Sequence, residues 1–530
     1  MPAHTTVFLG PPGTGKTTRL VAVVADLQRR GVPLARTAFL TFTVAAAKEA
    51  VDRLNLCAAE EEPPPWFCTI HAAAKRILKV LHPAIMDAEQ WLEFGHLHGY
   101  EFTPGIWSKR GVVEGGSRRM TRHDELRYVY GWGRARGLNL RRCLAICPTV
   151  VDRFDAAVFA QRVERFKADR DLVDFHDLLF DVLASGTQLP VTALIIDEAQ
   201  DLSPLQAQVV EQWAACCEEV YVAGDDDQAI FGFQGGDASW LRRCAEGGHV
   251  EVLGQSHRVP HAAHQIAGQI IRSNRTRIPK RYEPTDSPGT VEVMTLDEAL
   301  GSLDGQQPTL VLARNWLFLR GAAKQLIEGD VPFIGEGTDI WPNPLAKTGL
   351  LQALRAATAI VSGTAVAAAD LAALSRWLKV PGGSGPGKRT LGVVSPERAG
   401  ELLGPGRVCQ LREHGPAVVA QGLPDREYAY IGRMVAKYGE VPEPCIRLTT
   451  IHQAKGREAP TVVVLSDMTR ASHDELLDTR HGGNEAENRV AYVAVTRTSD
   501  RLVIVRPTTR RYYPYPGLGG SGVQLGRALP

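Results

Sequence analysis

Short apolar runs recur along the chain, separated by stretches with helical periodicity. The first run, residues 7–9, leads into a glycine-rich turn; apolar residues then repeat at helical spacing from Leu20 to Leu27, and Gly31 ends the pattern. A strand, a loop and a helix are predicted there. Seven later runs have the length and character of buried parallel strands: residues 38–42, 193–196, 220–223, 309–313, 447–451, 462–465 and 502–505. The predicted fold class is α/β.

Two long stretches interrupt this series of strands. Residues 82–176 carry aromatic and basic residues with little strand signal, which predicts a mainly helical insertion. Residues 344–444 contain an alanine-rich helix candidate at 350–360 and a glycine-rich loop at 382–387, which predicts a second insertion. The last residues, 507–530, are rich in Gly, Pro, Tyr and Arg, and we expect them to form a flexible tail.

Composition narrows the class of protein. At 530 residues several domains are expected, and 44% hydrophobic with 22% charged residues argues against general disorder. No apolar run approaches the ~18 residues of a membrane span and the first residues do not resemble a secretion signal, so a cytoplasmic protein without a membrane partner is expected. The nine cysteines lack paired CxxC spacing, which favours reduced thiols over a zinc cluster or a disulfide framework. The net charge of +1 neither indicates nor excludes nucleic-acid binding, because a local basic surface can exist in a nearly neutral chain.

The glycine-rich turn matches a phosphate-binding loop. Its residues are Gly10, Pro11, Pro12, Gly13, Thr14, Gly15, Lys16 and Thr17. Glycines let backbone N–H groups wrap phosphate oxygens at the positive end of a helix, and Lys16 would neutralise the β and γ phosphates. Because strand, loop and helix occur together, a chance glycine turn is the weaker interpretation. By itself the loop predicts only nucleotide binding.

A carboxylate pair follows the apolar run at 193–196. Thr17 offers a hydroxyl and Asp197 a carboxylate for Mg²⁺, while Glu198 could activate the attacking water. The alternative is a solvated acidic end of a strand. Mg²⁺ beside a bound nucleotide is therefore expected, and the resemblance described below implies that the nucleotide is ATP.

Seven further segments extend the pattern in a fixed order. They are TFTVAAAKEAVDRL from Thr41, CTIHAAAKRIL from Cys68, LIIDEAQDLSPLQ from Leu194, GDDDQAIFGFQGG from Gly224, LGQSHRVP from Leu253, TTIHQAKGREAP from Thr449 and NRVAYVAVTRTSDRL from Asn488. With these motifs the chain resembles the UvrD/Rep-like family of superfamily 1 helicases from residue 7 to about residue 505. The resemblance implies two RecA-like phosphate-loop NTPase lobes with parallel sheets, each carrying one mainly helical insertion.

The resemblance also implies roles at the nucleotide. Gln228 would sense the γ phosphate, and Arg258 and Arg497 would act as arginine fingers from the second lobe. Such fingers stabilise the charge that develops in phosphoryl transfer. Glu458 would contact the ribose. The remaining motif positions expected near the nucleotide are Thr18, His257 and Gly456.

A track for single-stranded DNA is implied by further motif positions. The family stacks bases on aromatic residues at the positions of Phe42, Phe231 and Phe233, a contact that tolerates any sequence. Short donors at four positions would hold backbone phosphates: Thr69, His71, Thr450 and His452. Two basic clusters could line a duplex or strand path or could be solvated faces: Lys109, Arg110, Arg118, Arg119, Arg122, Arg127, Arg134, Arg136, Arg141 and Arg142; and Arg272, Arg275, Arg277, Lys280 and Arg281.

The expected domain boundaries follow from the motifs and the interruptions. The first lobe would comprise residues 1–81 and 177–254, with residues 82–176 as its insertion. The second lobe would comprise residues 255–343 and 445–530, with residues 344–444 as its insertion. We expect a monomeric motor, with accessory proteins unknown.

The chain departs from the family pattern at the base-binding positions. Relatives commonly carry an upstream glutamine, an arginine at the position of Thr18 and a tyrosine at the position of His257. Gln234 replaces a usual arginine, which removes a fixed charge. Because the phosphate contacts are intact while the base contacts are reduced, weak discrimination among purine nucleotides is expected.

The interpretation from sequence is an ATP-dependent helicase or translocase on single-stranded DNA and its junctions with duplex, with 3′ to 5′ movement implied by the resemblance. A translocase that strips proteins with little unwinding would use the same motifs. RNA as the track, and a binding module with a vestigial ATPase, are two further hypotheses. The pathway, whether repair, replication, recombination or a phage programme, stays open.

Overall fold

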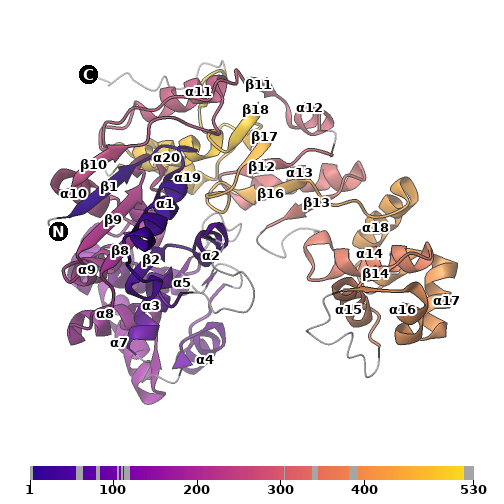
Figure 1. The fold of residues 1–530 in the computed structure, drawn as a ribbon, viewed down its shortest axis with the longest axis horizontal. Helices are drawn as coiled ribbons and strands as arrows, with labels where there is room; N and C mark the ends of the chain where they lie inside the picture. Colours follow the sequence, from indigo (N-terminus) through magenta and orange to yellow (C-terminus); the bar gives the residue numbers. More distant parts are fainter. Residues whose placement is uncertain are drawn as a thin grey trace. The chain divides into compact units, whose positions relative to one another are not determined.

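The chain divides into two compact units, which are described separately. The structure is a computed structural model that describes residues 4–54, 64–78, 84–103, 107–108, 111–112, 120–303, 305–336, 344–380, 392–480 and 482–518. Unit 1 comprises residues 1–290, 469–500 and 513–530, and unit 2 comprises residues 291–468 and 501–512. Figure 1 shows the elements of both units in sequence colours.

Unit 1 is built on a six-stranded parallel sheet in the order β10-β1-β9-β8-β2-β3. The strands are β1 (Thr5–Leu9), β2 (Thr37–Thr41), β3 (Phe67–Thr69), β8 (Ala193–Ile196), β9 (Glu219–Gly224) and β10 (His249–Val252). The carboxyl ends of β1, β9 and β8 meet at one edge, because all three run in the same direction. The phosphate loop, the acidic pair and the Gly224 motif each follow one of these strands.

Helices cover both faces of this sheet. On one face α1 (Lys16–Arg29) buries Leu20, Val23, Val24 and Leu27 against strand residues such as Phe8. The other face is covered by α3 (Ile70–Ile77), α8 (Phe175–Ser185), α9 (Pro204–Ala214) and α10 (Ser239–Gly247). A sheet that is apolar on both faces requires this arrangement, which explains why its central strands read as continuous apolar runs.

Residues 84–173 form a mainly helical segment with its own core. Its helices are α4 (Ala88–His98), α5 (Arg122–Ala135), α6 (Leu140–Ile146) and α7 (Arg153–Asp169), joined by the short strands β4 (Ala84–Ile85), β5 (Trp107–Ser108), β6 (Gly111–Val112) and β7 (Leu172–Val173). Phe94, Phe159 and Phe166 are buried together, with edge-to-face ring contacts at centroid distances of 5.4–5.6 Å. The helical character expected here is confirmed over the described residues.

Unit 2 contains the second six-stranded sheet, in the order β11-β18-β17-β12-β16-β13. Its strands are β11 (Thr290–Met294), β12 (Thr309–Ala313), β13 (Phe333–Gly335), β16 (Ile446–Thr450), β17 (Ala459–Leu465) and β18 (Thr498–Val505). The pairs β12–β17, β12–β16 and β13–β16 are parallel. The α/β class with two parallel-stranded sheets is therefore confirmed.

Helices surround this second sheet and continue into a helical segment. Next to the strands lie α12 (Leu296–Gly301) and α13 (Trp316–Glu328). The helices α14 (Leu350–Val361), α15 (Ala368–Trp377), α16 (Pro396–Leu403), α17 (Pro405–His414) and α18 (Asp425–Tyr438) follow, with the short pair β14 (Val366–Ala367) and β15 (Val393–Val394). The expected helix at 350–360 is confirmed, whereas the loop at 382–387 lies outside the described residues.

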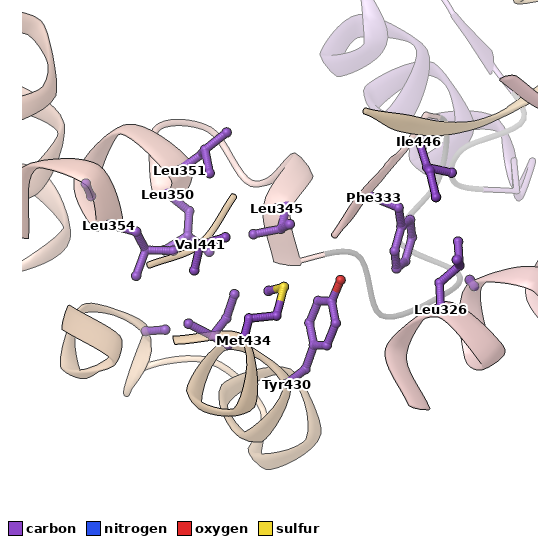
Figure 2. Close-up of a cluster of buried hydrophobic side chains, with 14 of the residues drawn as sticks. Leu326, Phe333, Leu345, Leu350, Leu351, Leu354, Tyr430, Met434, Val441 and Ile446 are labelled. Carbon is purple, nitrogen blue, oxygen red and sulfur yellow. The ribbon is translucent and has the colours of Figure 1, made fainter. Parts of the chain in front are cut away.

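One hydrophobic core joins the second sheet to these helices. Figure 2 shows Phe333 and Ile446 from the strands, with Tyr430 and Met434 of α18 directed toward the same cluster. The Tyr430 hydroxyl donates to the Val331 carbonyl at 2.6 Å, so the buried phenol keeps a polar partner. The helical segment and the sheet are therefore packed as one body.

The expectation of a flexible tail from residue 507 is wrong for the part that the structure describes. Asp467 is buried and accepts hydrogen bonds from the backbone and hydroxyl groups of Thr508 and Thr509. Tyr513 is 4% exposed, and its hydroxyl donates to Asn488 Oδ1 at 2.7 Å. The segment has no apolar period because hydrogen bonds and single tyrosines anchor it. Residues 519–530 lie outside the described range.

Further helices in unit 1 are α2 (Val44–Arg53), α11 (His261–Ile271), α19 (Arg470–Leu477) and α20 (Gly483–Val495). Asn488 of α20 is fully buried, and its Nδ2 donates to Ser273 Oγ at 2.9 Å and Asn274 Oδ1 at 2.8 Å. This amide therefore links α20 to the segment after α11 and to Tyr513. Among the described residues, no helix combines the length and apolar character needed to cross a membrane.

The core in Figure 2 predicts a large stability loss on truncation of Phe333. Its ring is 1% exposed, so Phe333→Ala should lower the free energy of unfolding by about 3–5 kcal/mol, through lost burial and a cavity. Val393→Ala is the control, because Val393 is 72% exposed and should change stability by less than ~0.5 kcal/mol. Urea denaturation compares the two, and equal midpoints would contradict the packing.

Candidate nucleotide site

The loop between β1 and α1 is held in a tight conformation by its own residues. Gly13 and Gly15 have φ values of 76° and 79°, which glycine adopts without the cost of a side chain. The Thr14 hydroxyl donates to the Pro11 carbonyl at 2.9 Å, and Lys16 Nζ donates to the Gly10 carbonyl at 2.7 Å. The loop leads into the first turn of α1, where backbone N–H groups and the helix dipole favour an anion.

The acidic pair lies against the start of α1. Thr17 Oγ1 donates to Asp197 Oδ2 at 2.8 Å, joining two residues 180 positions apart. Burial, and then the neighbouring Glu198 carboxylate, raise the pKa of Asp197 to about 6. Glu198 has φ 55°, a left-handed conformation that is costly for a residue with a side chain. A hydroxyl beside a buried carboxylate that resists ionisation is a set of hard oxygen donors suited to a divalent cation.

Residues 256–282 pack onto the outside of the phosphate loop. Ser256 Oγ donates to the Pro12 carbonyl at 2.9 Å, the His257 backbone N–H donates to the Gly13 carbonyl at 2.8 Å, and the Tyr282 hydroxyl donates to the Pro12 carbonyl at 3.2 Å. A Cβ atom on Gly13 would lie 2.6 Å from the Arg258 Cβ, so Arg258 starts directly against the loop. The His257 side chain is exposed, as is Thr18.

Gln228 and Arg497 meet in the interior of unit 1. Arg497 is 2% exposed, and its Nη2 donates to Gln228 Oε1 at 3.2 Å while Nε donates to the Val493 carbonyl at 3.0 Å. Gln228 Nε2 donates in turn to Asp225 Oδ2 at 2.7 Å. Burial raises the pKa of Asp225, but Lys280 and Lys16 outweigh it and hold the pKa below its usual value. The site therefore joins the loop lysine, the acidic motif and the late arginine electrostatically.

Three consecutive buried aspartates surround one lysine. Lys280 Nζ lies 3.0 Å from Asp225, 2.5 Å from Asp226 and 2.9 Å from Asp227, and its side chain is 1% exposed. Burial lowers the pKa of Lys280, but the three carboxylates outweigh this and raise the pKa overall. The trio has the spacing of a metal site, yet the ammonium group already compensates its charge. We therefore assign it no metal.

The proposed DNA-stacking residues of unit 1 lie together. Phe42 and Phe231 stack with centroids 5.2 Å apart, and Phe233 lies 6.0 Å from Phe231. All three are half-buried, so part of each ring faces outward. Thr69 is the N-cap of α3 and accepts from Ala72 N, and His71 packs edge-on against a neighbouring ring.

The proposed site residues of unit 2 lie at the end of β16 and in the segment that follows it. Thr450 is fully buried and its hydroxyl accepts from Gln453 N at 3.4 Å, and His452 is 5% exposed. Gly456, with φ 84°, and Glu458 are exposed in the loop before β17. These residues sit at the end of the sheet, and their roles stay predictions.

Both basic clusters are used largely for internal contacts where the structure describes them. Arg127 lies over Trp91 and Trp107, with its guanidinium carbon 3.9 and 4.0 Å from the ring centroids. Arg134 pairs with Glu164, Asp174 and Asp177, and the remaining internal pairs are Arg122 with Asp155, Arg136 with Asp237, Arg277 with Asp227 and Arg281 with Glu283. A continuous basic path is therefore not supported. Arg141, Arg142, Arg272 and Arg275 are exposed, and Lys109, Arg110, Arg118 and Arg119 lie outside the described residues.

Sequence reasoning missed the residues that hold the site together. Ser256, Tyr282, Lys280 and Gln200 carry its internal hydrogen bonds and ion pairs. Ser256 and Gln200 stand inside the helicase motifs and could have been singled out as buried polar positions. Tyr282 and Lys280 gave no such signal, because nothing in a sequence pairs Lys280 with aspartates 53 to 55 positions earlier.

Two family models match the chain, in the order expected from the motifs. An AAA domain model matches residues 1–234, and the UvrD-like helicase C-terminal domain model matches residues 434–508. Together with the two sheets and the phosphate loop, they define the class: the chain belongs to the UvrD/Rep-like family of superfamily 1 helicases.

Particular relatives align over most of the chain. UvrD2 of Mycobacterium tuberculosis, named an ATP-dependent DNA helicase, is 25% identical over 94% of this chain and 75% of its own length. DNA helicase II of Escherichia coli is 21% identical over 97% of this chain and 84% of its own. YjcD of Bacillus subtilis is 23% identical over 95% of this chain and 77% of its own. A solved Arterivirus nonstructural protein 10 (helicase) aligns with a TM-score of 0.32 at 12% identity over 97% of this chain and 61% of that one, too low for a structural argument.

The crowding at Gly13 predicts a loss of nucleotide binding in Gly13→Ala. Alanine would need a left-handed conformation, costing about 1–2 kcal/mol, and its Cβ would overlap Arg258 and Ser256. Affinity for a fluorescent ATP analogue should fall at least ~10-fold. Gly31→Ala is the matched control: Gly31 has φ 88° but open space around its Cβ, so stability should fall while affinity stays at the wild-type value. If Gly13→Ala and Gly31→Ala both bind the ATP analogue as tightly as wild type, the steric conflict of the Gly13 Cβ with Arg258 and Ser256 is excluded.

The buried trio predicts strong destabilisation by Lys280→Met. Removing the ammonium leaves Asp225 and Asp226 without their cation and Asp227 with Arg277 alone, so the free energy of unfolding should fall by about 3–5 kcal/mol. Lys324→Met, at a lysine that is 76% exposed, should change it by less than ~0.5 kcal/mol. Because the pKa of Lys280 is raised, its contribution is complete below pH 10.5 and disappears only at higher pH. A variant as stable as wild type at pH 8 would exclude this role.

Proposed function

We propose that the chain is an ATP-hydrolysing motor that moves along single-stranded DNA and unwinds duplex DNA ahead of it. One observation carries the proposal: within one compact unit, Thr17 of the phosphate loop donates to Asp197, Gly10 N donates to the Gly224 carbonyl at the start of the acidic motif, and Arg497 donates to Gln228 of that motif. Phosphoryl transfer needs a phosphate cradle, a metal site and positive charge at the γ phosphate, and this arrangement offers all three. The relatives named ATP-dependent DNA helicase support ATP as the fuel and DNA as the track.

The residues of the loop and the acidic pair divide the chemistry. The loop from Gly10 to Thr17 binds the phosphates, with Lys16 compensating their charge. Thr17 and Asp197 fit a Mg²⁺ ion, because a buried carboxylate with a pKa near 6 beside a second carboxylate favours a cation. Mg²⁺ bound there supplies charge compensation for the transferred phosphoryl group. Glu198 is the proposed base that orients and deprotonates the attacking water.

Positive charge at the γ phosphate comes from two arginines. Arg258 lies against Gly13 of the loop, and Arg497 is held by its hydrogen bond to Gln228 Oε1. A guanidinium held in place before the reaction stabilises the transition state without reorganisation. Thr18, His257, Gly456 and Glu458 are proposed to contact the rest of the nucleotide; Thr18 and His257 are exposed, consistent with a loose hold on the base.

The DNA track is proposed to run over the aromatic cluster. Phe42, Phe231 and Phe233 present partly exposed rings, and each base stacked on such a ring contributes roughly 1–3 kcal/mol. Phe231 and Phe233 follow Gln228 by three and five residues. A movement of Gln228 in response to the γ phosphate is therefore proposed to displace these two rings along the same short segment. Thr69, His71, Thr450 and His452 are proposed phosphate contacts.

The lobe boundaries remain part of this proposal: residues 1–81 and 177–254 with insertion 82–176, and residues 255–343 and 445–530 with insertion 344–444. Residues 255–290 and 469–500 belong to unit 1, where Ser256 and Tyr282 donate to the Pro12 carbonyl of the phosphate loop and Arg497 donates to Gln228 Oε1. Movement 3′ to 5′, a monomeric state and a cytoplasmic location belong to the proposal as well.

A second candidate is a translocase that displaces proteins with little unwinding. It is favoured by the internal pairing of Arg127, Arg134 and Arg136, which leaves residues 120–173 with less free basic surface for a duplex. Streptavidin displacement and unwinding of 3′-tailed and 5′-tailed duplexes separate the two candidates. ATPase stimulation by matched DNA and RNA strands tests the track.

Arg497→Ala tests the proposed chemistry. Loss of the guanidinium should lower DNA-stimulated kcat by about 10³-fold or more, because an arginine finger contributes ~10³–10⁵ in rate. Arg470→Ala, at an arginine that is 85% exposed, should keep wild-type kcat. Phosphate release with and without single-stranded DNA is the measurement. If Arg497→Ala hydrolyses ATP at the wild-type rate, the motor interpretation fails.

A further inference from the structure

Gln200 occupies a buried position between the acidic pair and the Gln228 motif. It lies in the 3₁₀ turn Ala199–Asp201 directly after β8, and it is 1% exposed. Its side chain reaches the end of β9, where Asp225 N donates to Gln200 Oε1 at 3.0 Å. A Cβ atom on Gly224 would lie 2.7 Å from that oxygen, so the glycine makes room for this contact.

The contact with Asp225 fixes the orientation of the Gln200 amide. A backbone N–H group can only donate, so the atom that faces it must be the carboxamide oxygen. The NH₂ group then points to the other side, where it donates to Glu198 Oε2 and lies 3.4 Å from Asp201 Oδ2. The backbone N–H of Asp225 therefore decides which end of the Gln200 carboxamide is the oxygen and which is the NH₂ group.

Glu198 has a particular need for such a partner. Its φ of 55° takes the chain out of the strand conformation, and its backbone N–H already donates to Asp197 Oδ1 at 2.9 Å. A base must point one carboxylate oxygen at the water that it activates, within hydrogen-bond reach. The Gln200 NH₂ group, as a donor on Oε2, restrains the orientation of the Glu198 carboxylate.

We infer that Gln200 is a positioning residue that orients Glu198 for ATP hydrolysis and links it through Asp225 to Gln228. The inference rests on the proposed ATPase function and deepens it. Gln200 oxygen accepts from Asp225 N, and Asp225 Oδ2 accepts from Gln228 Nε2. Glu198 and Gln228 are thereby connected by three hydrogen bonds through two residues, the side chain of Gln200 and the backbone N–H and carboxylate of Asp225. Through these bonds, a displacement of Gln228 would change the orientation of the Glu198 carboxylate.

Kinetics of Gln200→Ala test this role. Orientation of a base is worth part of the ~10²–10⁴-fold that general base catalysis supplies, so kcat should fall about 10- to 100-fold, with KM for ATP within about twofold of wild type. Gln206→Ala is the matched control, because Gln206 is also buried and hydrogen-bonded, to Ser203 N at 2.9 Å, but lies outside the site. It should lose stability and keep kcat.

Gln200→Glu supplies a readout that a structural role would not move. The ionisable groups around this position are Glu198, Asp201 and Asp225, with Lys16 acting on Asp225 from the phosphate loop. An ionised Glu at position 200 would repel Glu198, whereas a protonated one can donate to it. The ratio of wild-type kcat to Gln200→Glu kcat should therefore shrink as pH falls from 8 to 6. If the alanine variant does not fold, this pH dependence tests the positioning role of Gln200 in its place.

The outcomes separate the inference from the function on which it rests. A wild-type protein without DNA-stimulated hydrolysis, or Glu198→Gln with full activity, would overturn the proposed function. If wild type is active and Glu198→Gln inactive, but Gln200→Ala keeps wild-type kcat or the Gln200→Glu ratio is independent of pH, the positioning role is excluded. A fall in kcat with unchanged KM, together with the pH-dependent ratio, supports it.

Discussion

The nucleotide site depends on how the carbonyl groups of the phosphate loop are held. The carbonyls of Pro12 and Gly13 accept from Ser256, His257 and Tyr282, which come 244 to 270 residues later. In a planar peptide the N–H and C=O groups point in opposite directions, so holding these carbonyls on one side turns the following N–H groups to the other. The cradle for phosphate is therefore shaped partly from outside the loop.

Charge balance is the second constraint. Unit 1 buries Asp225, Asp226 and Asp227 next to one another, and Lys280 lies among all three. Such a cluster is tolerable only when each charge has a close partner of opposite sign. Asp225 then serves two purposes, as a member of this cluster and as acceptor for the Gln228 amide, so the acidic motif is at once structural and part of the site.

Much of the fold could be predicted from sequence because the central strands are apolar on both faces. The runs at 193–196 and 309–313 match β8 and β12 in full, and the phosphate loop falls where its glycines place it. The edge strands of the first sheet were missed: β10, His-Val-Glu-Val, alternates over only four residues and β3 has three residues, so both are too short to stand out as strands. Backbone pairing with a neighbour, which a pattern does not reveal, defines them.

The candidate site was predictable where a motif fixed both the residue type and its neighbours, as at Lys16 and Thr17. It was not predictable where a contact joins distant parts of the chain. Lys280 and Arg277 read as free basic residues in sequence, although they compensate buried aspartates. Net charge along a chain cannot distinguish a solvated cation from one enclosed among carboxylates, because the distinction depends on tertiary structure.

The buried tyrosine near the end of the described chain has a consequence for handling the protein. Tyr513 holds Asn488, and α20 continues from Asn488 to the turn that carries Arg497. A shortened form that ends before Tyr513 would leave the Asn488 amide oxygen without this partner, so that only the Nδ2 bonds to Ser273 and Asn274 would hold this side chain. An affinity tag or fluorophore appended after residue 518 would leave that anchor intact.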